Sequence, residues 1–250
     1  MARLRPNRVK AKLMRGEPAT VVAGTMTSDL IEFFGNLGFD GAWVEAEHGP
    51  FDFGDISDLT RACDLWGMTS IVRVNLNLPG VIYRTLDQGA QGIVMPHVDT
   101  AEQARAVVRA SKFQPVGARG MITSRQGIGV ENFMETANDE TLVIVLIEDI
   151  VAVENLDEIL KVDHIDVFFV AGSDLAQSMG YPSGHADVNV AIDQTNRRIV
   201  AAGRRAGAVV EDDTLDMYLE QGATFLMSAW EPWASSGAEA YLKRVPAASK

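Results

Sequence analysis

The sequence predicts an α/β fold, a TIM (β/α)8 barrel that forms a single domain over residues 1–250. The first observation is an alternation of short β-rich apolar runs with helical patterns, which gives eight strands along the chain. The second is the length of 250 residues, which is typical of one such barrel. No linker or shift in composition divides the chain, and a doubly wound open sheet is the alternative architecture.

The most informative stretch runs from Leu142 to Glu148, where six apolar residues end on one carboxylate. A run that is apolar on both faces is typical of a strand buried in a parallel sheet. A second such run, at 165–171, leads to Asp174, and residues 151–161 between the two runs have helical spacing. Strand, helix and strand of this length form one βαβ unit, whose parallel strands lie about 4.8 Å apart. We therefore expect Glu148 and Asp174 to meet at one edge of the sheet.

The other elements follow the same alternation. Strands are predicted at residues 20–24, 42–48, 70–74, 92–98, 208–210 and 224–228. Helices are predicted at residues 29–37, 55–66, 100–111, 188–205, 214–221 and 233–244. One more helix is predicted to begin at the turn formed by residues 77–80 and to end at Gln88. Residues 113–138 contain four glycines and a proline without a lasting period, which is typical of a functional loop.

The ends and the composition narrow the function classes. Met1–Arg15 is basic and lacks the apolar core of a signal peptide, so it is predicted as an amphipathic helix whose Val9 and Leu13 close one end of the barrel. No apolar run approaches the roughly 18 residues of a membrane-spanning helix. The net charge of 22 − 34 = −12 argues against nucleic acid and anionic membranes as partners. The lone Cys63 is predicted to be a small buried hydrophobe, which fits a cytoplasmic protein.

Catalytic residues of a barrel belong at the carboxyl ends of its strands. The predicted strand ends carry two acids and a base candidate after strand two, a cation after strand three, and one acid after each of strands five and six: Glu45, Glu47, His48, Arg73, Glu148 and Asp174. Taken alone, His48 is more often a hydrogen-bonded structural histidine, and Arg73 a salt-bridge partner at the barrel mouth. Together they favour a site over that structural reading. The orientation of His97, after strand four, is left open.

Two converging carboxylates need a counter-charge, and their oxygen atoms favour a divalent Mg²⁺ or Mn²⁺ ion. A zinc site of Cys and His has no support, since neither CxxC nor HExxH occurs. No lysine falls at a strand's carboxyl end, which argues against a Schiff-base mechanism. A metal that chelates a 2-oxo acid polarises its carbonyl group, an arginine stabilises the developing charge, and His48 could move the proton of an aldol hydroxyl.

Several segments resemble the HpcH/HpaI aldolase family of class II, metal-dependent pyruvate aldolases. They are Val44–Pro50, Val72–Arg73, Leu86–Ala90, Ile147–Glu148 and Ser173–Leu175, in the family's order between about Lys10 and Tyr241. The resemblance implies a TIM barrel that assembles as a hexamer, a trimer of dimers, in which the C-terminal helix can swap between subunits.

The resemblance implies a role for each residue that stands at a matching position of the family's motifs. It implies that Glu148 and Asp174 are the ligands of a divalent cation, Mg²⁺ or Mn²⁺ with Co²⁺ as a further candidate. It implies that Arg73 holds the pyruvyl carbonyl oxygen and that His48 is the base, with Asp87 as the acidic partner of a His–Asp dyad. The backbone amides of Ser173 and Asp174 would hold the pyruvate carboxylate. The chain departs from the family at Ala171-Gly172-Ser173, where Gly-Pro-Ala is common, and at Leu146, where some members have Gln.

The function expected from these residues is metal-dependent, reversible aldol cleavage of 4-hydroxy-2-oxo acids to pyruvate, or a close 2-oxo-acid analogue, and an aldehyde. One alternative is a carbon–carbon lyase of the citryl- or malyl-CoA type, and another is a non-catalytic 2-oxo-acid-binding barrel. Arg119 and Arg125 in the irregular stretch could hold a distal carboxylate of the acceptor or be solvated loop charges. The acceptor aldehyde, the stereochemistry and the preferred metal are left open.

Overall fold

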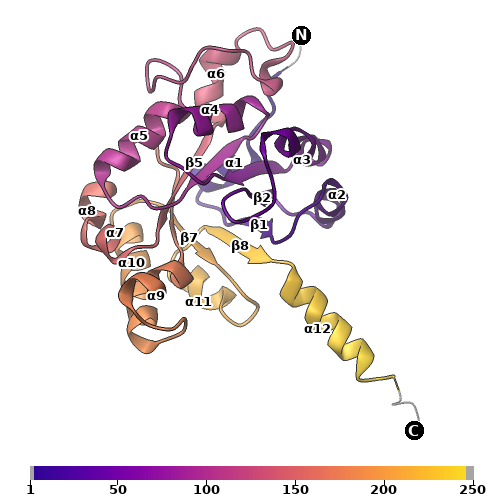
Figure 1. The fold of residues 1–250 in the computed structure, drawn as a ribbon, viewed down its shortest axis with the longest axis vertical. Coiled ribbons are helices and arrows are strands. Elements are labelled where there is room, and N and C mark those ends of the chain that lie inside the picture. Colours follow the sequence, from indigo (N-terminus) through magenta and orange to yellow (C-terminus); the bar gives the residue numbers. More distant parts are fainter. Residues whose placement is uncertain (1–2, 246–250) are drawn as a thin grey trace.

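The computed structural model describes residues 3–245, and its centre is a closed barrel of eight parallel strands (Figure 1). The strands are β1 Ala19–Ala23, β2 Gly41–Glu45, β3 Thr69–Arg73, β4 Gly92–Met95, β5 Leu142–Ile147, β6 Val167–Val170, β7 Ala206–Val209 and β8 Phe225–Ala229. Each strand pairs with the next one in the sequence, and β8 closes the barrel against β1. The predicted (β/α)8 barrel is therefore confirmed, and the open sheet is excluded.

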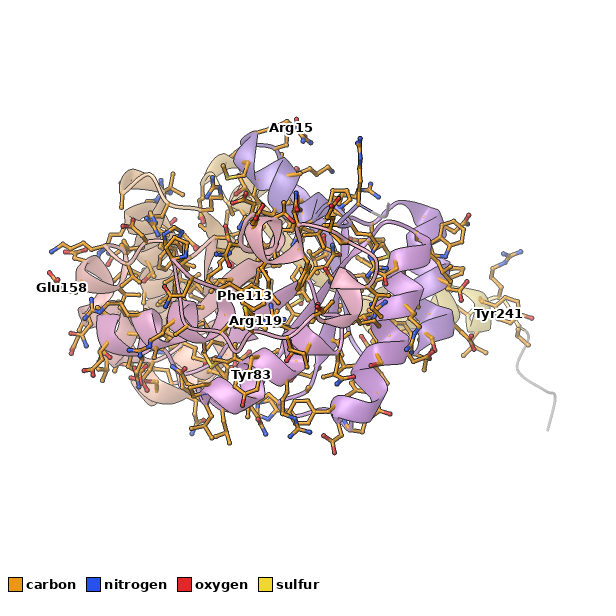
Figure 2. The ribbon with its side chains drawn as sticks, turned by 90° about the horizontal axis from the view of Figure 1, so that it is seen from above. Arg15, Tyr83, Phe113, Arg119, Glu158 and Tyr241 are labelled. Carbon is orange, nitrogen blue, oxygen red and sulfur yellow. The ribbon has the colours of Figure 1, made fainter. Side chains whose placement is uncertain are left out.

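Helices cover the outside of the barrel, and Figure 2 shows their side chains around the molecule. The helices are α1 Arg8–Met14, α2 Ser28–Leu37, α3 Phe53–Leu65, α4 Pro79–Asp87, α5 Ala101–Ser111, α6 Phe133–Glu140, α7 Ile150–Glu154, α8 Leu156–Ile159, α9 Gly172–Met179, α10 Ala186–Ala201, α11 Leu215–Glu220 and α12 Glu231–Leu242. Within residues 3–245, no helix combines the length and the apolar character that crossing a membrane requires.

The interior of the barrel is a packed core, and it forms the floor beneath the carboxyl ends of the strands. Trp43, Phe169 and Phe225 are buried there, with ring centroids 5.4 Å apart for the first pair and 5.9 Å apart for the second. Val9 and Leu13 of α1 join the same cluster, so the predicted closure of one barrel end by the N-terminal helix is confirmed.

The last helix, α12, differs from the others because it points away from the barrel (Figure 1). Its side chains Tyr241 and Leu242 are 66% and 64% exposed. At its start, the Glu231 carboxylate accepts a hydrogen bond of 2.6 Å from the backbone N–H of Thr25. This bond ties the base of α12 to the β1–α2 loop.

Several predicted boundaries were wrong, and for three of them the structure shows how the segment differs. Residues 151–161 form two short helices, α7 and α8, because the chain turns at Asn155, and Val151 is largely exposed. The irregular stretch ends earlier than predicted, since α6 already begins at Phe133. The second strand ends at Glu45 because its carboxylate accepts hydrogen bonds from the N–H groups of the next loop.

Lys112 is buried near the amino-terminal end of β5, at 2% exposure. Its ammonium group donates hydrogen bonds of 2.6 Å to the carbonyl oxygens of Asn138 and Thr141. Burial, aided by the charge of Lys10, lowers the pKa of Lys112 to about 7. The folded state therefore binds this proton more weakly than the unfolded state does.

This lowered pKa gives a prediction for the pH dependence of stability. Between pH 7 and the ordinary lysine pKa the unfolded chain holds more protons, so the free energy of unfolding should rise with pH, by at most about 1.4 kcal/mol per pH unit. Urea titrations of the wild-type protein at pH 7, 8 and 9 measure that slope. The Lys112→Met variant should have a smaller slope, and an unchanged slope would contradict the role of Lys112.

Candidate active site

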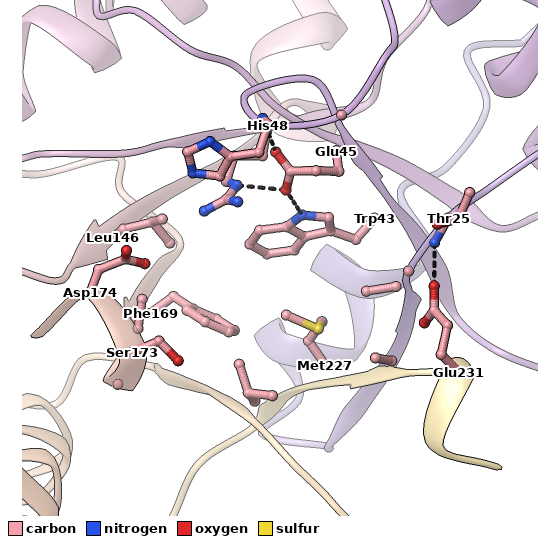
Figure 3. A pocket seen from close by; sticks show the side chains of 18 of the residues that line it. Thr25, Trp43, Glu45, His48, Leu146, Phe169, Ser173, Asp174, Met227 and Glu231 are labelled. Atoms are coloured by element: carbon pink, nitrogen blue, oxygen red, sulfur yellow. Dashed lines mark hydrogen bonds and ion pairs between the residues drawn. The ribbon is translucent and has the colours of Figure 1, made fainter. Parts of the chain in front are cut away.

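A pocket of about 420 Å³ opens at the carboxyl ends of the strands (Figure 3). Five of the residues singled out in the sequence line it: Glu45, His48, Arg73, Ser173 and Asp174. Its floor consists of apolar side chains from the barrel interior, including Trp43, Leu146 and Phe169. The wall formed by β1, β7 and β8 carries Ala23, Val209 and Met227. The pocket thus has apolar side chains on this wall, next to the charged Glu231 at the start of α12.

Arg73, at the end of β3, is held by two acids of the neighbouring strand and loop. Its Nε donates to Glu45 Oε2 at 2.6 Å, and one of its terminal nitrogens lies 3.1 Å from Glu47 Oε2. Parallel pairing sets Glu45 directly beside Arg73 in the sheet, so the contact follows from the register. Burial works to raise the pKa of Glu45, but the hydrogen bond and charge of Arg73 outweigh it and keep this pKa below its usual value.

Glu148 follows β5 and is 3% exposed. Its Oε1 accepts a hydrogen bond of 2.6 Å from the backbone N–H of His97. Burial is the main cause that raises the pKa of Glu148; the His97 hydrogen bond opposes the rise, and the charges of Asp174 and Glu47 add to it. Crowded carboxylates of this kind are stable in the charged form only beside a cation.

The residues present fit a divalent cation between Glu148 and Asp174. Ile147 and Val170 are partners in the β5–β6 register, so the residues that follow both strands stand at the same rim. Asp174 lies in the first turn of α9 and lines the pocket. Within residues 3–245 no three His, Cys, Asp or Glu side chains are gathered as ligands, so an ion held by these two carboxylates would need water or substrate oxygens at its other positions.

The amino-terminal end of α9 also faces the pocket. Gly172, Ser173 and Asp174 form its first turn. The side chain of the N-cap residue, Ala171, makes no capping hydrogen bond to their N–H groups. The free N–H groups of a helix start favour an anion, so this turn could hold a substrate carboxylate.

His48 lies in the loop after β2, and its side chain is 69% exposed at the pocket. Its backbone N–H donates to Glu45 Oε1 at 3.1 Å, which fixes the loop (Figure 3). The Nε2 atom lies 3.8 Å from Glu47 Oε2. This solvent-accessible imidazole is positioned to exchange a proton with a bound molecule.

Within residues 3–245 no hydrogen bond joins Asp87 to His48. Asp87 ends α4, and its Oδ1 accepts a hydrogen bond of 2.7 Å from Arg119. Arg125 instead pairs with Asp64 at 2.7 Å. The proposal that Arg119 and Arg125 hold an acceptor carboxylate was therefore wrong, and so was the solvated alternative, because both guanidinium groups are largely buried in ion pairs.

His97, whose orientation the sequence left open, lies beside Glu148 at the rim. Its backbone has φ +52°, in the left-handed region that few residues other than glycine adopt. Nδ1 of its ring lies 3.2 Å from Glu148 Oε1, and Nε2 lies 3.5 Å from Glu47 Oε1. In the sequence, only the position of His97 after a predicted strand indicated that it lies at the rim, because residue spacing does not reveal a left-handed turn.

The fold and the rim define an enzyme-type (β/α)8 barrel with an acidic pair, a guanidinium group and an imidazole at the carboxyl ends of its strands. A family model described as HpcH/HpaI aldolase/citrate lyase matches residues 22–232, and the chain belongs to this family. The predicted family and the predicted enzyme class, an aldolase-type carbon–carbon lyase, are thereby confirmed.

Individual relatives agree with this assignment. A 2-keto-3-deoxy-L-rhamnonate aldolase from Klebsiella pneumoniae is 37% identical over 235 residues, which cover 90% of this chain and 88% of the relative. The Escherichia coli K12 protein of that name is 36% identical over the same shares. Among solved structures, an HpcH/HpaI aldolase/citrate lyase family protein from Burkholderia cenocepacia superposes with a TM-score of 0.89 at 26% identity, covering 95% of this chain and 98% of that one.

Proposed function

We propose that this protein cleaves a 4-hydroxy-2-oxo acid, reversibly and with a divalent metal, into pyruvate or a close 2-oxo-acid analogue and an aldehyde. The observation that carries the proposal is the rim itself: Arg73 and Asp174 line one pocket, and the buried carboxylate of Glu148 lies close enough to Asp174 for their charges to interact. Aldolases among the relatives support this chemistry and do not favour the citryl- or malyl-CoA lyase alternative. They act on a 2-keto-3-deoxy sugar acid, as their name states.

Glu148 and Asp174 are the proposed ligands of the ion, which we expect to be Mg²⁺ or Mn²⁺, with Co²⁺ as a further candidate. When bound, the ion supplies Lewis-acid polarisation of the substrate's 2-oxo group. Arg73 keeps a guanidinium group at that oxygen because Glu45 and Glu47 fix its orientation. The N–H groups of Ser173 and Asp174 orient the substrate carboxylate.

His48 is the proposed base. It removes the proton of the substrate's 4-hydroxyl group, directly or through one water molecule, as the bond between the third and fourth carbon atoms breaks. In the condensation direction the same imidazole returns that proton to the new hydroxyl. The apolar floor of Trp43, Leu146 and Phe169 excludes water from the reacting carbon atoms.

The resemblance makes Asp87 the acidic partner of His48, and this role stays a prediction, although Asp87 pairs with Arg119 in this chain. We also propose the hexamer, a trimer of dimers, as the working assembly. Exposed Tyr241 and Leu242 of α12 support exchange of this helix between subunits. A single domain over residues 1–250 and a cytoplasmic location stay predictions.

Replacing His48 by Ala tests the base. We expect kcat to fall by about 10²–10⁴-fold, the usual contribution of general acid–base catalysis, while Mn²⁺ binding changes little because His48 is not a proposed ligand. Steady-state rates and calorimetric metal titrations measure the two effects. Because the matched His185→Ala variant changes a histidine in the loop before α10, it should keep full activity. Unchanged turnover in the His48→Ala variant would remove this residue as the base.

The function itself is tested by a screen for pyruvate release. The wild-type protein is incubated with a panel of 4-hydroxy-2-oxo acids, with and without a chelator, and pyruvate is measured with a coupled dehydrogenase. We expect release from at least one acid, abolished by the chelator and restored by Mn²⁺. If metal and pyruvate bind but no acid is cleaved, the non-catalytic binding barrel is the better reading.

A further inference from the structure

We infer that His97 is the positioning residue of the cation site: it holds the Glu148 carboxylate and joins it to Glu47. The inference rests on the proposed function in one respect, that Glu148 is a metal ligand. It adds a residue to which neither the sequence pattern nor the proposed reaction assigns a role. Four observations carry it.

The first observation is the backbone. His97 follows β4 and adopts φ +52°, a conformation that costs a residue with a side chain roughly 1 kcal/mol or more. This conformation aims the N–H of His97 at Glu148 Oε1, 2.6 Å away. A strained turn that delivers a hydrogen bond to one carboxylate oxygen is typical of a site where position matters.

The second observation is the ring. Nδ1 lies 3.2 Å from the same oxygen that the backbone N–H contacts, so one residue approaches Glu148 Oε1 twice. The ring and the backbone of one residue thus both lie against Oε1, which leaves the other oxygen of Glu148 for the ion.

The third observation is the far side of the ring. Nε2 lies 3.5 Å from Glu47 Oε1, while Glu47 Oε2 is 3.1 Å from Arg73. His97 therefore bridges the proposed ligand Glu148 and the acid that orients the guanidinium group. A change at one end of this chain of contacts reaches the other end.

The fourth observation is burial. The side chains of Glu148 and Glu47 are 2% and 8% exposed, whereas that of His97 is 67% exposed. Because the imidazole of His97 is largely exposed, it can be removed without opening a cavity in the core. Its removal should thus affect the ion more than the fold.

Two variants separate the ring from the backbone. His97→Gly keeps the N–H and suits the left-handed conformation, but it deletes the ring. His97→Asn tolerates the same conformation and places an amide N–H near the position of Nδ1. Partners of this kind typically contribute 10–100-fold to metal affinity. We expect the dissociation constant for Mn²⁺ to rise about 10–100-fold in His97→Gly, and we expect His97→Asn to recover most of the loss.

Calorimetric titration of the substrate-free protein with Mn²⁺ measures these constants, and thermal unfolding shows that each variant folds. The matched control is His164→Gly, because His164 also has a positive φ, +64°, but lies before β6 at the opposite end of the barrel. It should leave Mn²⁺ affinity unchanged.

Equal Mn²⁺ affinity in the wild-type protein and His97→Gly would overturn the inference while leaving the aldolase proposal intact. Nitrogen coupling in pulsed electron paramagnetic resonance of the Mn²⁺ complex would also overturn it, because it would make His97 a ligand. A wild-type protein that binds no Mn²⁺ would sink the inference and the metal-dependent function together.

Discussion

The Glu148→Gln variant is expected to lose at least about 10³-fold in kcat/KM for aldol cleavage. Metal ions that polarise a carbonyl group contribute several kcal/mol to transition-state stabilisation, and each 1.36 kcal/mol is a factor of ten in rate. The amide keeps the shape of the side chain and can still accept the His97 hydrogen bond, but it removes the charge that holds the ion. Calorimetric titration should show that Mn²⁺ binding is lost in parallel.

The same substitution should stabilise the metal-free protein. Because burial raises the pKa of Glu148, the folded state binds this proton more tightly than the unfolded state does. Cation-free wild-type protein therefore loses stability as the pH rises from the ordinary glutamate pKa through the raised one, and Glu148→Gln avoids that loss. We expect a higher melting temperature for this variant at neutral pH with chelator present.

A control separates loss of the site from loss of a negative charge in general. Glu154 lies on α7, close to Glu148 in the sequence but exposed, so Glu154→Gln should change neither activity nor Mn²⁺ affinity. Full activity of Glu148→Gln in the presence of a chelator would end the proposal that this carboxylate holds an ion.

Replacing Arg73 by Ala is expected to lower kcat/KM by about 10²–10³-fold, as when one preorganised donor is removed from a developing oxyanion. It also leaves Glu47, which is largely buried, without its guanidinium partner. Arg73→Lys should recover only part of the rate, because an ammonium group cannot replace the fork that contacts Glu45 and Glu47 together. Initial rates over a range of substrate concentrations measure both variants.

The pH dependence of stability gives a second readout for Arg73. Arg73 keeps the pKa of Glu45 below its usual value, so this carboxylate stabilises the wild-type fold above the ordinary glutamate pKa and stops doing so as the pH falls through the lowered one. The difference in unfolding free energy between the wild-type protein and Arg73→Ala should therefore narrow in acid. Arg198→Ala, which breaks an exposed pair with Asp157, should show little difference at any pH. A difference that stays constant with pH would contradict the assignment.

The fold could be predicted because its signals are local and repeated. Each buried strand is a short apolar run such as Leu142–Ile147, and each helix has its own spacing, so the barrel follows from order and length. Boundaries were less predictable where one side chain decides them. Glu45 ends β2 three residues before the predicted end of this strand, and Asn155 divides a helix whose spacing is continuous.

The site could be predicted only in part, for a physical reason. Residues at strand ends, such as Arg73 and Glu148, are placed by the register of the sheet, and register follows from the pattern. Residues in loops are placed by turns that no pattern encodes. The left-handed turn that brings His97 to Glu148 and the ion pair that keeps Asp87 with Arg119 are both of this kind.

Two halves of the barrel mouth contribute different kinds of residue to the pocket. The groups assigned to the chemistry come from β2, β3, β5 and the start of α9, whereas Ala23, Val209 and Met227 belong to β1, β7 and β8. Mutations on that second half can reshape the space for the proposed aldehyde without moving a proposed ion ligand or the guanidinium group. Substitutions on β1, β7 and β8 can therefore change the substrate of such a barrel while its reaction stays the same.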